Sequence, residues 1–179
     1  MLDGRRVAAP GPAPHDAPKA RLTAVRAGFT RMRVFARRAF WAIKMLWGTA
    51  MDLRIMVVED SETTRRIIRA ILETREWRIC GEAKNGQAAI RQFRKLRPDV
   101  VILDFTMPDL SGIDVAARLS KIDPLVPLIL FTISEVEQLY DAASGAGIYA
   151  VVSKARAWDL IGTIEAAIAH LSDLGQPIQ

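Results

Sequence analysis

Cysteine and histidine are scarce in this chain of 179 residues, which contains one Cys and two His. The lone Cys80 excludes a disulfide framework and a cysteine-rich metal site, and its neighbours favour a small buried strand residue over a reactive thiol. With only His15 and His170, we do not expect a histidine-based metal site or a Ser/His/Asp triad. The chain also lacks an apolar run of about 18 residues and a clear signal peptide, which predicts no transmembrane helix and a location in the reducing cytoplasm.

Positive charge is concentrated in the first 50 residues. Residues 1–50 contain ten Lys and Arg against two Asp, a net of +8, whereas residues 51–179 have a net charge of −3. Residues 1–20 are rich in Pro, Ala and Gly and are expected to be a disordered leader. Residues 22–48 have the spacing of a basic amphipathic helix, which could contact an anionic membrane, a partner protein or nucleic acid. Alternatively, translation starts at Met51 and residues 1–50 have no selected function.

From residue 53 onward, strand patterns and helix patterns alternate. Short apolar segments predict strands at 54–58, 78–84, 100–103, 127–131 and 148–152. Apolar positions at helical spacing predict helices after Ser61 (with Ile67, Ile68, Ile71 and Leu72), after Asn85, and near 113–122, 135–144 and 157–171. This alternation predicts an α/β fold with a doubly wound, five-stranded parallel sheet in the order 2-1-3-4-5, which is the flavodoxin-like (βα)5 arrangement. We expect the domain to span residues 51–174, with a short tail at 175–179.

Polar side chains follow the expected strands at one end of the sheet. Glu59-Asp60 comes after the first strand, Asp104 after the third, Thr132 after the fourth and Ser153-Lys154 after the fifth. Because the carboxyl ends of parallel strands meet at one edge, we expect these residues to line the crevice where the strand order reverses. A carboxylate at the end of a buried strand, as Asp104 is, needs partners to remain charged.

These residue types suit phosphoryl transfer. Two like charges about 4 Å apart repel each other by roughly 1–4 kcal/mol, and a hard cation with oxygen ligands, such as Mg²⁺, relieves that repulsion. Asp104 would be the nucleophile that forms an aspartyl phosphate, and Lys154 and Thr132 would stabilise the phosphoryl oxygens. Taken singly, each residue also has an ordinary structural interpretation, as a first-turn acid, a turn residue, a strand-end cap or a surface lysine. Their joint placement favours the site.

Residues 53–172 resemble the response-regulator receiver domain of two-component signalling. The stretches that carry the resemblance are 56–61, 81–86, 101–112, 131–132 and 152–154. The resemblance implies that Asp104 accepts phosphate from the phosphohistidine of a partner kinase or from a small phosphodonor. Such a domain is a signalling phosphoacceptor, not an enzyme of the ordinary kind. Its partners would be a sensor histidine kinase or phosphotransfer protein and an unidentified downstream protein.

The resemblance also implies the ligands of the site. Asp60, Asp104 and the carbonyl of Thr106 would bind Mg²⁺, with Glu59 assisting. Thr132 and Lys154 would contact the phosphoryl group.

Three positions depart from the pattern of the family. Val151 stands where an aromatic switch residue is common, and Ala155 stands where the family often has Pro after the lysine. Ile133 replaces a residue that is often small, and its bulk could narrow access for the phosphodonor. We therefore expect the acceptor chemistry to be kept and the readout to differ.

Few residues follow the last expected helix, which predicts a single-domain response regulator with no C-terminal DNA-binding domain, acting in a phosphorelay by switching protein contacts. The alternative is a receiver-like interaction module that works without phosphorylation and could reach a membrane through residues 22–48. A dinucleotide enzyme or a nucleotide hydrolase is not favoured, because no G-x-G-x-x-G or P-loop sequence follows an expected strand.

Overall fold

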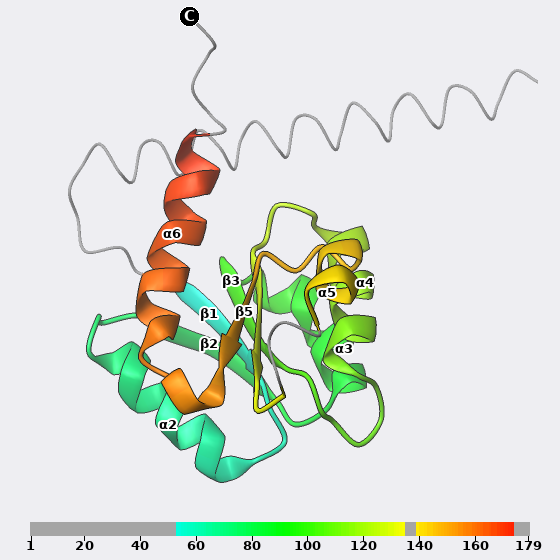
Figure 1. The fold of residues 1–179 in the computed structure, drawn as a ribbon, viewed down its shortest axis with the longest axis horizontal. Helices are drawn as coiled ribbons and strands as arrows, with labels where there is room; N and C mark the ends of the chain where they lie inside the picture. Colours follow the sequence, from blue (N-terminus) through cyan, green and yellow to red (C-terminus); the bar gives the residue numbers. More distant parts are fainter. Residues whose placement is uncertain (1–52, 135–138, 174–179) are drawn as a thin grey trace, which may run out of the picture. The chain divides into compact units, whose positions relative to one another are not determined.

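A single parallel sheet organises the part of the chain that the structure, a computed structural model, describes, namely residues 53–134 and 139–173. Its five strands lie in the order β2-β1-β3-β4-β5, which confirms the predicted doubly wound topology. Figure 1 shows helices α2 and α6 on one face of this sheet and α3, α4 and α5 on the other. The predicted leader, the predicted helix at 22–48 and the tail at 175–179 lie outside the described residues.

The elements follow the predicted alternation closely. The strands are β1 (Arg54–Val58), β2 (Arg78–Ala83), β3 (Val100–Asp104), β4 (Leu128–Thr132) and β5 (Ala150–Ser153). The helices are α2 (Glu62–Glu73), α3 (Gly86–Leu96), α4 (Gly112–Ile122), α5 (Tyr140–Gly145) and α6 (Asp159–Asp173), and a 3-10 turn, η2 (Lys154–Arg156), precedes α6. The largest differences concern β5, which begins two residues later than predicted, and the predicted helix at 135–144, of which residues 135–138 lie outside the described part.

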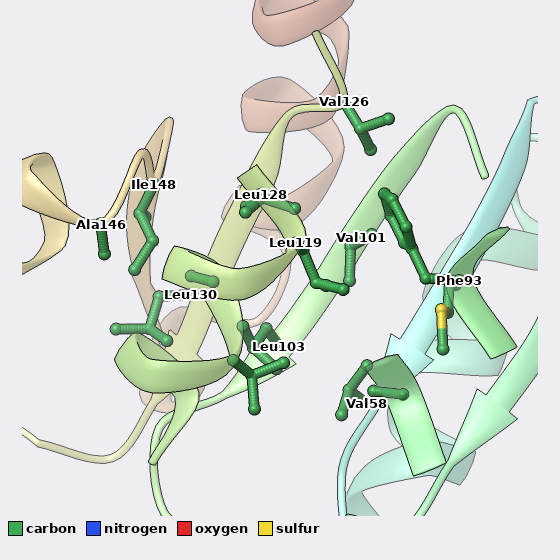
Figure 2. Packing of buried hydrophobic residues seen from close by; sticks show 14 of the residues in the cluster. Val58, Phe93, Val101, Leu103, Leu119, Val126, Leu128, Leu130, Ala146 and Ile148 are labelled. Carbon is green, nitrogen blue, oxygen red and sulfur yellow. The ribbon is translucent and has the colours of Figure 1, made fainter. Parts of the chain in front are cut away.

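The central strands bury side chains on both faces of the sheet. In β3, Val101 and Leu103 join the apolar cluster formed with α3, α4 and α5, which is shown in Figure 2. Val100 and Ile102 alternate with them and pack against α2 and α6 on the opposite face. This two-sided burial explains why the strand is a continuous apolar run, as is typical of strands in parallel α/β sheets.

Local capping positions three helices next to the loops at the carboxyl edge. The Ser61 hydroxyl accepts a hydrogen bond from the Thr64 N–H at the start of α2, and the Asn85 side chain accepts one from the Ala88 N–H at the start of α3. The Ser111 hydroxyl caps α4 in the same way. Of the apolar residues that predicted α2, Ile68, Ile71 and Leu72 are buried, whereas Ile67 faces outward with 48% of its surface exposed. Among the described residues, no helix has the length and apolar character needed to cross a membrane.

Candidate functional site

Three carboxylates meet at the carboxyl edge of the sheet: Glu59 and Asp60 follow β1, and Asp104 is the last residue of the neighbouring strand β3. Glu59 and Asp104 are buried, with 1% and 5% of their surfaces exposed, and Asp60 is exposed. One oxygen from each of the three lies within 4.8 Å of the other two. The strands place them there because β1 and β3 pair in parallel, with Val58 opposite Leu103, so the next residues, Glu59 and Asp104, emerge side by side.

Lys154, which directly follows the edge strand β5, joins this cluster. Its Nζ atom lies 2.8 Å from Glu59 Oε2 and 2.9 Å from Asp104 Oδ1, and 17% of its side-chain surface is exposed. The ammonium also lies 5.9 Å from the centre of the Phe131 ring. Because β5 ends at Ser153, Lys154 enters the crevice from the first residue of η2, where the Ser153 hydroxyl accepts a hydrogen bond from the Ala155 N–H.

The electrostatics of the crevice favour a further positive charge. Burial raises the pKa of Glu59 above its ordinary value; the hydrogen bond from Lys154 opposes that shift, and the charge of Asp104 adds to it. Burial alone would lower the pKa of Lys154, but its hydrogen bonds to Glu59 and Asp104 raise it above the ordinary value. The ammonium therefore stays charged, and it is shared between two carboxylates.

The two predicted threonines differ in their surroundings: Thr132 ends β4, the strand next to β3, and Thr106 lies two residues after Asp104 in the loop that follows β3. Register pairs Asp104 with Phe131, so Thr132 stands one residue further along the adjacent strand β4. Its side chain is fully buried, and its hydroxyl accepts a hydrogen bond of 3.0 Å from the Ser134 N–H. Thr106 is exposed in the loop that follows β3.

This loop is anchored by a residue that the sequence analysis did not single out. The carboxylate of Asp109 accepts hydrogen bonds of 2.9 Å from the N–H groups of Gly86 and Gln87, at the start of α3. At the other end of the loop, the Gly112 N–H donates to the Phe105 carbonyl at 2.8 Å. The first anchor joins residues that are distant in sequence, and the second joins main-chain atoms within irregular backbone. The types and spacing of the side chains therefore did not predict either contact.

The donor set fits a hard divalent cation. Among the residues that the structure describes here, the three clustered carboxylates supply only oxygen ligands, while Lys154 supplies one positive charge. Oxygen ligands at an acidic, partly exposed crevice suit Mg²⁺, which commonly uses one or two carboxylates and keeps several waters. Glu59, Asp60 and Asp104 are thus the residues able to hold such an ion.

Comparison with known proteins assigns the domain. Residues 55–165 match the family described as the response regulator receiver domain. This chain belongs to that family. The receiver domain, part of two-component signalling systems, thus accounts for most of the described residues, and the fold and strand order agree with it.

The relatives of this chain differ in how much of their own length it covers. Chemotaxis protein CheY of Thermotoga maritima is 35% identical over 80 residues, which are 45% of this chain and 67% of that protein. A protein-glutamate methylesterase/protein-glutamine glutaminase of Pyrococcus abyssi is 39% identical over 47% of this chain but only 23% of that enzyme. Among solved structures, a LuxR-family two-component response regulator from Aurantimonas sp. SI85-9A1 is 29% identical, with a TM-score of 0.64 and coverage of 67% of this chain and 87% of that one.

The three departures from the family pattern have distinct surroundings. Ile133 projects outward with 80% of its surface exposed, directly after Thr132. Val151 is half-buried and packs against the apolar cluster on the side of α3, α4 and α5. Ala155 is exposed within η2, next to Lys154. The bulky Ile133 therefore stands free beside the crevice, while Val151 contributes to the core.

Proposed function

We propose that this receiver domain is a Mg²⁺-dependent phosphoacceptor whose acceptor is Asp104. The observation that carries the proposal is the shared ammonium: Lys154 Nζ bridges Glu59 and Asp104 at distances of 2.8 and 2.9 Å, beside an exposed Asp60. The ammonium leaves one Asp104 oxygen available and lies where the oxygens of an incoming phosphoryl group would gather.

The chemistry follows from these residues. A carboxylate oxygen of Asp104 forms a bond to phosphorus as the P–N bond of a phosphohistidine breaks, and the imidazole nitrogen keeps that electron pair. With a small phosphodonor, the bond to its leaving group breaks instead. Lys154 then pairs with a phosphoryl oxygen, and the Thr132 hydroxyl turns from its local contact to donate to another.

A cation would be held by Glu59, Asp60, Asp104 and the carbonyl of Thr106. When bound, Mg²⁺ supplies neutralising charge to the phosphoryl oxygens. Asp60, which is the exposed member, can exchange a water for the ion with the least rearrangement.

In the cell, the acyl phosphate on Asp104 would switch protein contacts within a phosphorelay. We propose a sensor histidine kinase or a phosphotransfer protein as the donor and a protein as the downstream partner, with the exchange taking place in the cytoplasm. The same contacts made without phosphorylation are the alternative, which the test below separates from the proposal.

Intact-mass measurement after incubation with a small phosphodonor tests the proposal. We expect one phosphoryl adduct on the wild-type protein in Mg²⁺, no adduct in EDTA, and loss of the adduct with hydroxylamine, which cleaves acyl phosphates. Asp104→Asn should remove it completely, because an amide is not a nucleophile at phosphorus. Asp114→Asn is the matched control, since Asp114 is an exposed acid at the start of α4 and should leave the adduct unchanged.

The absence of an adduct on wild-type protein with small donors and with a cognate kinase would favour the phosphorylation-independent module. An adduct that survives in Asp104→Asn would place the acceptor elsewhere.

A further inference from the structure

A buried arginine lies directly behind the acidic pair. Arg65 belongs to the beginning of α2, and 2% of its surface is exposed, which is rare for a charged side chain. Its Nη1 atom donates to the main-chain carbonyl of Glu59 at 2.7 Å and to that of Asp60 at 2.9 Å. One guanidinium nitrogen thus holds both peptide units that carry the two carboxylates.

The remaining faces of this guanidinium are held by two other carboxylates. Nη2 of Arg65 pairs with Glu62 in the first turn of α2. Nε lies 3.2 Å from Glu82 Oε2 on β2, the strand next to β1. The hydrogen bonds of Nη1 and Nη2 therefore fix the orientation of the guanidinium, and the ion pair of Nε with Glu82, which is not a hydrogen bond, adds attraction from the neighbouring strand.

A neighbouring arginine shares the same carboxylates but not the acidic loop. Arg69, one turn later in α2, forms a two-bond pair with Glu82 at 2.6 and 2.7 Å and lies 3.3 Å from Glu62. The contacts found for it end at these side chains. Arg65 thus differs from Arg69 in the feature that concerns the crevice, because Arg65 donates hydrogen bonds to the carbonyls of Glu59 and Asp60.

We propose that Arg65 is a positioning residue for the cation site, acting through the main chain of Glu59 and Asp60. Replacing a buried ion pair by packed apolar residues often costs no stability, so the burial of this charge is not explained by stability alone. What the guanidinium supplies is a fixed orientation of two successive peptide units. That orientation presents the Asp60 carboxylate to the crevice while the Glu59 side chain turns inward to Lys154.

This inference rests on the proposed cation site, and it predicts an effect on affinity that differs from an effect on folding. Groups that orient metal ligands without touching the metal typically change affinity by about 10- to 100-fold when they are removed. Arg65→Gln should therefore raise the dissociation constant for a divalent cation about tenfold. Arg65→Lys, which keeps the charge but loses the fork, should raise it by a smaller factor.

The experiment measures cation affinity and stability on the same full-length proteins. Mn²⁺, followed by the loss of its free electron paramagnetic resonance signal, and Mg²⁺, followed by calorimetry, are titrated into wild type, Arg65→Gln, Arg65→Lys and Arg69→Gln. Thermal unfolding in EDTA is recorded for each. Arg69→Gln is the matched control, because it removes charge from the same pair of carboxylates, and its dissociation constant should stay within about twofold of the wild-type value.

Each outcome decides the proposal. An unchanged dissociation constant in Arg65→Gln, or an equal rise in Arg69→Gln, would overturn it, even if both variants are less stable in EDTA. If wild-type protein binds neither Mn²⁺ nor Mg²⁺, the proposed cation site itself is wrong and this inference falls with it. If the Arg65 variants do not fold, Glu82→Gln is the substitute, because it removes the charge on β2 that pairs with Arg65 and leaves Arg65 in place. It should raise the dissociation constant for the cation. An unchanged dissociation constant in Glu82→Gln would also overturn the proposal.

Discussion

At the scale of single residues, the crevice balances charge incompletely. The ammonium of Lys154 contacts both Glu59 and Asp104. Asp60 lies next to these carboxylates, and neither of the two contacts of the ammonium is to Asp60. Burial and the nearby charge of Asp104 both raise the pKa of Glu59, so both disfavour its charged form. A bound cation or a covalent change at Asp104 would redistribute Lys154 between its two partners, and this gives the site a physical means of responding to phosphorylation.

The position of Asp104 also depends on the absence of a side chain at residue 112. A Cβ atom added at Gly112 would lie 2.2 Å from the Asp104 carbonyl oxygen and 2.9 Å from Leu130 Cδ1. Backbone cannot yield as a flexible side chain does, so we expect Gly112→Ala to lower the free energy of unfolding by about 1–3 kcal/mol, as overpacked cores do. Urea denaturation measures this change, and phosphoryl incorporation should slow in parallel because the acceptor is displaced.

Gly162→Ala provides the control for that substitution. Gly162 lies inside α6, and an added Cβ meets no atom within 4 Å. Alanine should therefore stabilise the helix, by about 1 kcal/mol, with no effect on phosphorylation. Equal stability of Gly112→Ala and wild type would show that the close approach of residue 112 to the Asp104 carbonyl does not affect the free energy of unfolding.

Side-chain chemistry made the acidic residues and the lysine visible in the sequence, because each follows an apolar strand. Arg65 and Asp109 gave no such signal, since the contacts by which they fix the loops of the crevice are to main-chain atoms. Arg65 grips two carbonyls of the preceding loop, and Asp109 caps a helix that starts 23 residues earlier. Backbone carbonyls and N–H groups are present at almost every residue, so only the folded arrangement specifies which of them a side chain meets.

At the scale of elements, α3 and the loop after β3 form one unit. Asp109 accepts from two N–H groups at the start of α3, where the helix dipole also favours an anion. Gly86, at the start of the same helix, allows close packing on α4, because an added Cβ would lie 2.4 Å from Val115 Cγ2. The loop that carries Thr106 is thereby fixed to the start of α3.

This clamp predicts a specific pH dependence. The hydrogen bond from the Gln87 N–H lowers the pKa of Asp109 below its ordinary value of 3.8; desolvation opposes this shift, and the N–H groups of Gly86 and Leu110 add to the lowering. A lowered folded-state pKa contributes stability that is fully present above pH 3.8 and is lost as the pH falls through the lower folded-state pKa. Asp109→Asn should therefore be less stable than wild type near neutral pH, with a difference that shrinks below pH 3.8.

Urea midpoints of the two proteins across this range provide the measurement. A difference that stays constant down to the lowest pH would mean that the charge of Asp109 does not contribute through this clamp.

Helix and strand positions were largely predictable because each element buries one face or two. Strand β3 is apolar up to its last residue, Asp104, and was located within one residue, and α2 begins after the predicted cap at Ser61. The start of β5 was predicted two residues too early, since Ile148 packs in the core without belonging to the strand. The 3-10 turn η2 was not predicted, because three residues are too few to show a period.

At the scale of the whole molecule, the strand order brings distant residues to one crevice. Lys154 and Glu59 are 95 positions apart in the sequence, yet their charged atoms lie 2.8 Å apart. A cation held by the carboxylates that follow β1 and by the one that ends β3 must stabilise the folded domain, because it binds only where both strands are in place.

Magnesium should therefore raise the stability of the domain by mass action. At a free Mg²⁺ concentration of 100 times the dissociation constant, we expect a gain of about 2.7 kcal/mol in the free energy of unfolding, measured by urea denaturation. Asp60→Asn should remove most of this gain, and it should change the stability in EDTA little because Asp60 is exposed. NaCl at matched ionic strength is the control. The same gain from NaCl, or in Asp60→Asn, would contradict a specific cation site.

The sequence by itself determined the order of elements, the doubly wound parallel sheet and the identity of the acidic and basic residues at the strand ends. It could do so because burial imposes a readable period on helices and strands, and because parallel strands all end at one edge. Only the tertiary structure decided that Lys154 is shared by Glu59 and Asp104, that Asp109 clamps α3, and that Arg65 holds the backbone of the acidic pair. Those contacts depend on distances between segments remote in sequence and on main-chain atoms that no residue pattern distinguishes.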